Sequence, residues 1–246
     1  TDRSRGLGDV YKRQVYEKVR SSQLYDSELS MYKVNEPLAK ESYELGRCRA
    51  FTPGWLENES IWLHMEYKYL LELLKSGLYQ QYIGDLYKAA IPFQDEERYG
   101  RSILENSSFL ASSANPDESI HGRGFVARLS GSTVEFMDMW QRMMFGHTPF
   151  REEDDKLVFA LQPVIPSYLL DQERRVEAVF LGKVRIVYHV DAEDADYIPE
   201  NYEVVQYCLT GEKDKEIHIY QNQIMGEEAE NIRAGKYTQI EVWIKK

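Results

Sequence analysis

The stretch ESIWLHMEYKYLLELLKSG, residues 59–77, decides the fold of the first half of the chain. Its apolar residues recur at three- and four-residue steps, which is the spacing of one face of a helix. These residues are Ile61, Trp62, Met65, Tyr69, Leu73 and Leu74. Gly77 then supplies a helix stop. We therefore expect a helix over residues 59–76.

Two further segments carry a helical pattern. Residues 78–91 place Tyr82, Ile83, Leu86 and Ala90 on one stripe, and Pro92 follows. Because only the short link at Gly77 separates this segment from the preceding helix, the two should form an antiparallel hairpin. A third helix is expected from Ser130 to Gly146. Between the second and third helices, residues 94–124 form a long polar connection, and a connection of this length is usually functional.

The period of the pattern changes after Gly146. Short β-branched or aromatic runs, separated by Gly, Asp and Pro, predict strands. They cover residues 156–162, 174–180, 184–190, 203–209, 216–221 and 238–244. Helices followed by strands indicate an α+β fold, not alternating βαβ units. We place the domain boundary near Pro149. The acidic run at residues 152–155 and the pair Glu227 and Glu228 are expected to be solvated loops or turns.

Composition limits the function classes. The 246 residues suffice for one or two domains, and the formal net charge of -11 disfavours nucleic acid and anionic membranes as partners. No apolar run approaches the ~20 residues of a membrane span. Cys48 and Cys208 match no metal or redox spacing, and two lone thiols suggest a reducing, cytoplasmic compartment. His147, His189 and His218 also lack partners at metal spacing, so structural roles are expected.

The beginning of the chain looks foreign. Residues 9–14, DVYKRQ, resemble the translation of a transposon end used to prepare sequencing libraries. We therefore expect residues 1–14 to be a non-native leader that packs against nothing, with native sequence beginning near Val15. An ordinary basic N-terminal arm is the alternative.

Two motifs carry chemistry. Glu57 and His64 lie seven residues apart, two turns of a helix, so that both side chains could face one cleft. Further on, residues 129–133 read LSGST, which places Ser130, Gly131 and Ser132 at an expected helix start. Free backbone N–H groups and the helix dipole attract an anion at such a start.

These motifs resemble those of the inverting β-glycoside phosphorylases of glycoside hydrolase family 94, which include cellobiose phosphorylase. Members carry a Glu-Asn-Gly-Gly-x-x-x-His segment and, downstream, Leu-Thr-Gly-Thr. The likeness continues through Phe145-Gly146 to a strand that closes on residues 163–166, PVIP. The resemblance implies that residues 15–149 are the last part of a barrel of helical hairpins and residues 150–246 a small jelly-roll-like β domain. The weaker similarity of residues 105–124 suggests a separate branch, with the 1,2-β-oligoglucan phosphorylases as one candidate.

The resemblance also implies a phosphate site. Phosphorolysis needs an acid to protonate the leaving oxygen and a phosphate to attack the anomeric carbon from the opposite face. By their match to the family, His64, Ser130, Gly131 and Ser132 would bind phosphate. Ser130 stands where relatives have Thr, which keeps the hydroxyl. Arg123 could add a positive charge.

Sugar contacts are less well matched. Glu57 corresponds to the family glutamate that contacts the acceptor sugar, and Trp55 could stack on a sugar ring. Glu59-Ser60 replaces the Gly-Gly pair, which puts the sugar subsites in question because glycine permits close approach to the backbone. Simpler roles stay open: dipole complementation for Glu57, packing for Trp55, and a place in the core for His64.

The general acid of the family lies in an Asp-Trp-Asn-Asp-Gly type segment, which this sequence does not contain. The resemblance places it upstream, so the chain alone should be inactive. The full-length enzyme would cleave a β-linked glucose oligosaccharide with phosphate, inverting the anomer to give α-glucose 1-phosphate, without a metal or further cofactor. A hydrolase or transglycosylase of the same fold, or a noncatalytic carbohydrate-binding protein using the β domain, are the alternatives. A homodimer is left open.

Overall fold

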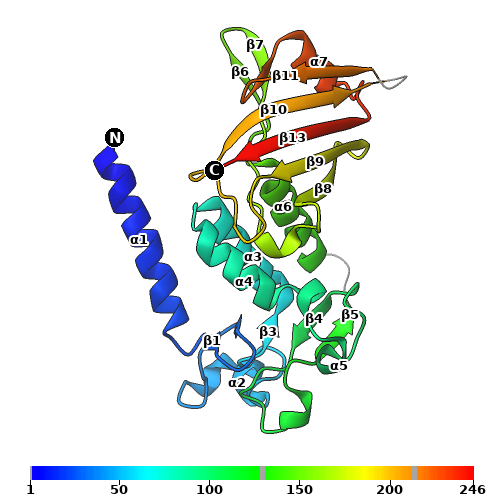
Figure 1. The fold of residues 1–246 in the computed structure, drawn as a ribbon. Coiled ribbons are helices and arrows are strands. Elements are labelled where there is room, and N and C mark those ends of the chain that lie inside the picture. The colour runs from blue at the N-terminus through cyan, green and yellow to red at the C-terminus, as the bar shows by residue number, and fades with distance from the viewer. Residues whose placement is uncertain (1, 128–130, 212–214) are drawn as a thin grey trace. The chain divides into compact units, whose positions relative to one another are not determined.

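The computed structural model describes residues 2–127, 131–211 and 215–246 (Figure 1). The chain divides into two compact units, Thr1–Met139 (unit 1) and Trp140–Lys246 (unit 2). The division falls within a long helix, before the boundary expected near Pro149. Both helices and strands are present, which confirms the α+β class. None of the sheets that the described residues form is closed.

Unit 1 is organised around a helical hairpin. Its helices are α1 (Asp2–Arg20), α2 (Arg47–Ala50), α3 (Leu63–Lys75), α4 (Tyr79–Ala89), α5 (Glu96–Tyr99) and the first part of α6 (Gly131–Phe145). The predicted hairpin is confirmed as α3 and α4, joined through Gly77 at φ +76°. Glycine adopts this left-handed conformation without a steric cost.

The apolar stripe of α3 matches the predicted one in part, at Leu73 and Leu74. Its buried side chains include Leu63, Tyr67, Leu70 and Leu74, whereas Met65 is 46% exposed. Full burial of a Leu or Phe-sized side chain stabilises the fold by about 1.5–3 kcal/mol, so this face anchors the helix. The helix also starts later than expected, because the two residues before Leu63 form a strand.

Short strands complete unit 1. The strands β1 (Tyr25–Asp26) and β2 (Met31–Tyr32) form one antiparallel pair. A three-stranded antiparallel sheet has the order β3 (Ile61–Trp62), β4 (Ser107–Leu110) and β5 (Gly124–Ala127). Unit 1 therefore also contains short paired strands, which the helical pattern of the sequence did not predict. All four residues of β4 are buried, so this piece of the polar connection is part of the core.

The leader also differs from expectation. Residues 2–20 form α1, and Lys12 Nζ donates a hydrogen bond to the carbonyl of Ser76 at 3.2 Å. Further along α1, Arg20 forms an ion pair with Asp85 of α4. The prediction that residues before Val15 pack against nothing was therefore wrong at Lys12. No helix within the described residues has the length and apolar character needed to cross a membrane.

Unit 2 contains two sheets. The larger has the order β11 (Glu216–Ile219), β10 (Glu203–Thr210), β13 (Gln239–Lys245), β9 (Val184–Val190) and β8 (Arg175–Phe180). Its neighbours are antiparallel except for β13 and β9, which run parallel. The smaller sheet has the order β12 (Ile224–Met225), β7 (Lys156–Phe159) and β6 (Phe150–Glu153).

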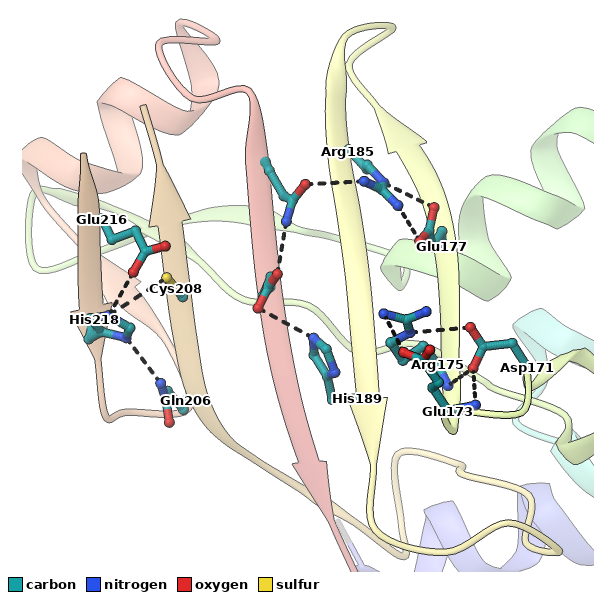
Figure 2. A network of polar contacts seen from close by, with 12 residues as sticks. Asp171, Glu173, Arg175, Glu177, Arg185, His189, Gln206, Cys208, Glu216 and His218 are labelled. Carbon is teal, nitrogen blue, oxygen red and sulfur yellow. Dashed lines mark hydrogen bonds and ion pairs between the residues drawn. The ribbon is translucent and has the colours of Figure 1, made fainter. Parts of the chain in front are cut away.

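An aromatic core holds unit 2 together. Side chains alternate between the two faces of a strand, and in β13 Ile240, Val242 and Ile244 are buried while the residues between them are not. Phe180 contacts the ring of Phe159 at a centroid distance of 5.8 Å. The opposite face of the larger sheet carries charged and polar side chains (Figure 2).

The acidic run at residues 152–155 ends in a turn, as expected in part, whereas Glu227 and Glu228 begin a helix instead of a loop or turn. Asp154 and Asp155 have φ values of 49° and 58° and make the tight turn between β6 and β7. Two consecutive positive φ values suit the right-handed twist of a hairpin. Glu227 and Glu228 lie in the first turn of α7 (Glu227–Arg233), where carboxylates complement the helix dipole.

Candidate functional site

The motif residues around Trp55 and His64 lie in an aromatic cluster of unit 1. The Trp55 ring meets Phe109 edge-on at 5.1 Å, and Phe109 stacks on Trp62 at 5.7 Å. Trp62 in turn contacts the His64 ring at 5.6 Å with an interplanar angle of 88°. The structure therefore brings Trp55 and His64 into one cluster through β3 and β4. In this cluster Trp55 packs against other aromatic rings, which is the packing role considered as the alternative to stacking on a sugar.

Glu57 does not share a helix with His64. It lies in the loop before β3, and its Oε1 accepts a bond from Arg47 Nη2 at 2.8 Å. The strand β3 separates this loop from α3. The expectation that Glu57 and His64 lie two helical turns apart was therefore wrong, because the helix begins only at Leu63.

The loop has an unusual backbone at Glu59. Its φ is +59°, in the left-handed region where glycine is favoured. Two contacts hold it there. The Glu59 N–H donates to Asn35 Oδ1 at 2.8 Å, and Lys33 Nζ lies 2.9 Å from Glu59 Oε2. Both side chains of this ion pair are nearly buried, at 10% and 8% exposed. Glu59 therefore has a backbone conformation that glycine adopts more readily.

His64 is the second residue of α3 and is half-buried. The Trp62 indole against which it rests is itself fixed, since Nε1 donates to the carbonyl of Leu56 at 2.8 Å. The loop, the strand β3 and the helix start therefore together define the environment of the imidazole. This arrangement fits a positioned side chain at the rim of the core.

The second motif is described in part. Ser130 lies outside the described residues, and Gly131 is the first residue of α6. Ser132 is buried in the first turn of that helix. The predicted helix start is confirmed at Gly131, within one residue of the expected position.

Two contacts bring the N-terminal halves of α3 and α6 together. Lys68 Nζ lies 3.8 Å from Glu135 Oε1. The rings of Tyr67 and Phe136 lie 5.5 Å apart. Each helix carries a motif residue about one turn from these contacts, His64 on α3 and Ser132 on α6.

Arg123 lies just before β5 and is exposed. Its guanidinium runs beside Gly100, where an added Cβ would meet Arg123 Nε at 3.0 Å. Gly100 has φ +67° and ends α5. Because Gly100 has no side chain, the Arg123 guanidinium can lie against its backbone.

Sequence reasoning missed two buried carboxylates in the hairpin. Glu66 Oε2 accepts a bond from the Tyr32 N–H at 2.9 Å, and Oε1 has no hydrogen-bond partner among the described residues. Asp85 Oδ1 accepts from Arg20 at 2.6 Å and Oδ2 from the Tyr32 hydroxyl at 2.7 Å. The sequence did contain a signal for a buried carboxylate, because Glu66 lies on the apolar face of α3 between Leu63 and Tyr67.

Burial raises the pKa of Glu66 to about 8, and the charge of Asp85 adds to this rise. The bond from the Tyr32 N–H opposes it without cancelling it. Glu66 is therefore largely a neutral carboxylic acid at pH 7. Strongly shifted groups occur at functional sites and in structural networks alike, and the enclosure of this one favours a structural role.

Unit 2 has a polar cavity of 270 Å³. Hydrogen-bonding side chains form much of its lining: Arg151, Gln162, Tyr202, Glu203, Asn222 and Gln223. Arg151 Nη2 donates to Gln223 Oε1 at 2.5 Å across part of this wall. Such a lining suits a hydroxyl-rich ligand.

Comparison with known proteins does not assign this chain to a family. No protein-family model matches the sequence, and the curated proteins contain no significant match to it.

Proposed function

We propose that this chain is part of an inverting glycoside phosphorylase of the family 94 type. The observation that carries the proposal is the φ of +59° at Glu59. A left-handed conformation costs an L-residue roughly 1–2 kcal/mol, so a glutamate there indicates that the loop needs this backbone shape. Relatives that the motif resembles have glycine at the position, which supplies the same shape without cost.

The phosphate site follows from the two helix starts. His64 on α3 and the Ser130-Gly131-Ser132 segment at α6 would supply imidazole, hydroxyl and backbone N–H donors. The contact of Lys68 with Glu135 supports their proximity, since it joins the N-terminal halves of the two helices. Donors of this kind hold an anion without a repelling carboxylate. Arg123 would contribute charge from the neighbouring sheet.

The reaction itself requires an upstream segment. An aspartic acid there would protonate the leaving oxygen while phosphate attacks the opposite face of a β-linked glucose unit. The product would be α-glucose 1-phosphate. In this proposal the helices of unit 1 complete a barrel of helical hairpins with that segment, and the two sheets of unit 2 form the jelly-roll-like domain. Glu57, paired with Arg47, would be available to an acceptor sugar at the loop.

A restored full-length enzyme tests the proposal. His64→Ala should raise the KM for phosphate at least about tenfold, because a charge-assisted bond contributes about 1.5–3 kcal/mol. The KM for the oligosaccharide should change much less. His189→Ala, a variant on the sheet of unit 2, is the matched control and should change neither constant. Turnover that proceeds without phosphate would replace the proposal with the hydrolase alternative.

A specific observation favours a second candidate, carbohydrate binding by unit 2. The polar cavity of 270 Å³ is slightly smaller than the ~300 Å³ at which pockets for drug-sized ligands begin, which suits a ligand as small as one sugar unit. Arg151→Ala should then weaken the binding of a β-linked gluco-oligosaccharide to the chain, measured by calorimetry. Arg185→Ala, on the larger sheet, is the control. No heat of binding with the unaltered chain would exclude this candidate.

A further inference from the structure

Three metal-binding side chains meet on the polar face of the larger sheet in unit 2. Cys208 belongs to β10, and Glu216 and His218 belong to β11 (Figure 2). The strand register pairs Cys208 directly with His218. Residues two apart on one strand point to the same face, so Glu216 lies on the side of His218. Figure 2 shows the three side chains turned toward one another.

The separations of their ligand atoms suit a tetrahedral ion. His218 Nε2 lies 4.0 Å from Cys208 Sγ and 3.3 Å from Glu216 Oε2. All three ligand atoms lie within 4.8 Å of one another. Zinc with tetrahedral angles would place sulfur and nitrogen ~3.6 Å apart, and nitrogen and oxygen ~3.3 Å apart, given bonds of ~2.3 Å to sulfur and ~2.0–2.1 Å to the others. The observed nitrogen–oxygen separation therefore equals the tetrahedral one, and the sulfur and nitrogen would have to approach by ~0.4 Å.

The three side chains differ in how deeply they are buried. Cys208 is 4% exposed at the base of the group. The side chains of His218 and Glu216 are 44% and 58% exposed, so they can adjust and leave one side open to water. The second imidazole nitrogen, Nδ1, lies 3.2 Å from Gln206 Nε2. A half-turn of this amide would place Gln206 Oε1 there as the acceptor of Nδ1–H, which is the tautomer that leaves Nε2 open to a metal.

A histidine–glutamate pair without a third ligand offers a comparison for the group. The same sheet face carries a second pair, His189 Nε2 and Glu241 Oε2, at 3.4 Å. There the imidazole stacks on Trp243 with an interplanar angle of 9°. In the part of the chain that the structure describes, the Cys208 group is the one set of three such ligands within this distance. The His189 pair therefore serves as a built-in comparison.

We propose that Cys208, Glu216 and His218 bind one Zn²⁺ ion, with water in the fourth position. Thiolate and imidazole together favour zinc over magnesium or calcium, which prefer oxygen ligands. The charges also fit, because a thiolate and a carboxylate neutralise the two positive charges of the ion. Glu241, opposite Cys208 in the neighbouring strand β13, adds to the negative field.

The proposal is tested on the intact 246-residue chain, free of any affinity tag and of bound metal. Cobalt(II) serves as the spectroscopic probe, and a chromophoric chelator measures Zn²⁺ affinity by competition. One equivalent of cobalt should give a thiolate-to-cobalt charge-transfer band and the visible bands of a tetrahedral ion. Zinc should displace the cobalt and abolish both signals.

Variants identify the ligands. Cys208→Ser should remove the charge-transfer band, and His218→Gln and Glu216→Gln should weaken Zn²⁺ binding at least about tenfold. The last two positions are exposed, so these variants keep the test valid even if the change at Cys208 disturbs the fold. His189→Gln and Cys48→Ser are the matched controls and should bind as the unaltered chain does.

Three outcomes would overturn the proposal. The first is a chain that binds no cobalt or zinc. The second is a charge-transfer band that Cys208→Ser leaves in place. The third is an equal loss of affinity in His189→Gln and His218→Gln, which would indicate general attraction of cations to an acidic sheet face.

Discussion

Glu66 accepts a hydrogen bond from the backbone N–H of Tyr32 at 2.9 Å, inside the core of unit 1. The bond joins α3 to β2 and fixes one carboxyl oxygen. Burial nevertheless disfavours the ionised form, which raises the pKa of Glu66 from 4.5 to about 8. The side chain therefore couples proton binding to folding.

The first prediction concerns this coupling. Between pH 4.5 and about 8 the folded chain holds the Glu66 proton more tightly than the unfolded chain does. Its contribution to stability is complete below the lower value and is lost as pH rises through the upper one. Glu66→Gln should remove this loss and make the chain more stable than the unaltered protein at pH 8, by about 1 kcal/mol or more. Urea unfolding at pH 5.5 and pH 8 measures the difference. Glu72→Gln, an exposed change on the same helix, should keep the original slope.

The second prediction concerns the ion pair between α1 and α4. Arg20 Nη1 lies 2.6 Å from Asp85 Oδ1, and the Asp85 side chain is only 3% exposed. Arg20→Met leaves a buried carboxylate with only the neutral hydroxyls of Tyr32 and Tyr16 as partners, so a loss of about 3 kcal/mol is expected. Chemical denaturation gives the value. The exposed pair of Lys75 with Glu72 is the control, and Lys75→Met should cost about 1 kcal/mol or less. Equal losses of stability in Arg20→Met and Lys75→Met would contradict a stabilising buried ion pair between α1 and α4.

The third prediction concerns the strained loop. Glu59→Gly would relieve a left-handed backbone but leave Lys33 without its carboxylate in a nearly buried place. The loss of the partner exceeds the gain, so the single variant should lose about 2 kcal/mol. Adding Lys33→Met removes the uncompensated charge, and the double variant should recover most of that loss. A double-mutant cycle of unfolding free energies provides the measurement. Additive effects of the two changes would contradict a direct coupling.

The helical hairpin could be predicted because its signal is local. Gly77 and the surrounding apolar steps indicate two helices and their connection without any knowledge of distant residues. The predicted stripe was right at Leu73 and Leu74, but Ile61 and Trp62 belong to a strand. Strands of two to four residues, such as β3 and β4, are too short to show an alternating pattern. The pairing of β3 with β4 also joins residues more than forty positions apart, for example Ile61 with Leu110.

Sites that depend on pairing across strands were also beyond the sequence. Cys208 and His218 are ten residues apart and match no metal spacing, yet the register of β10 and β11 places them opposite each other. Spacing rules describe ligands within one helix or loop, whereas here the fold sets the distance. The left-handed Glu59 is a similar case, because its conformation depends on Lys33 and Asn35 from an earlier segment.

The last prediction concerns a histidine that ties a loop of unit 1 to an earlier segment. His121 Nδ1 lies 3.0 Å from Glu28 Oε1, and Nε2 lies 2.7 Å from the carbonyl of Asn115. Burial alone would lower the pKa of His121, but these contacts raise it above its ordinary value of 6.5. The charged form therefore stabilises the fold fully below pH 6.5, and this contribution is lost as pH rises through the higher folded value.

Glu28→Gln removes one cause of the rise, so the pKa of His121 should fall. A proton NMR titration of the imidazole measures the shift directly. The midpoint of thermal unfolding at pH 6 should also exceed that at pH 8 by less in the variant than in the unaltered chain. Glu36→Gln, another change in the same stretch of chain, is the control and should leave the titration unchanged. A titration of His121 that Glu28→Gln does not move would show that the carboxylate is too well solvated, at 60% side-chain exposure, to influence the ring.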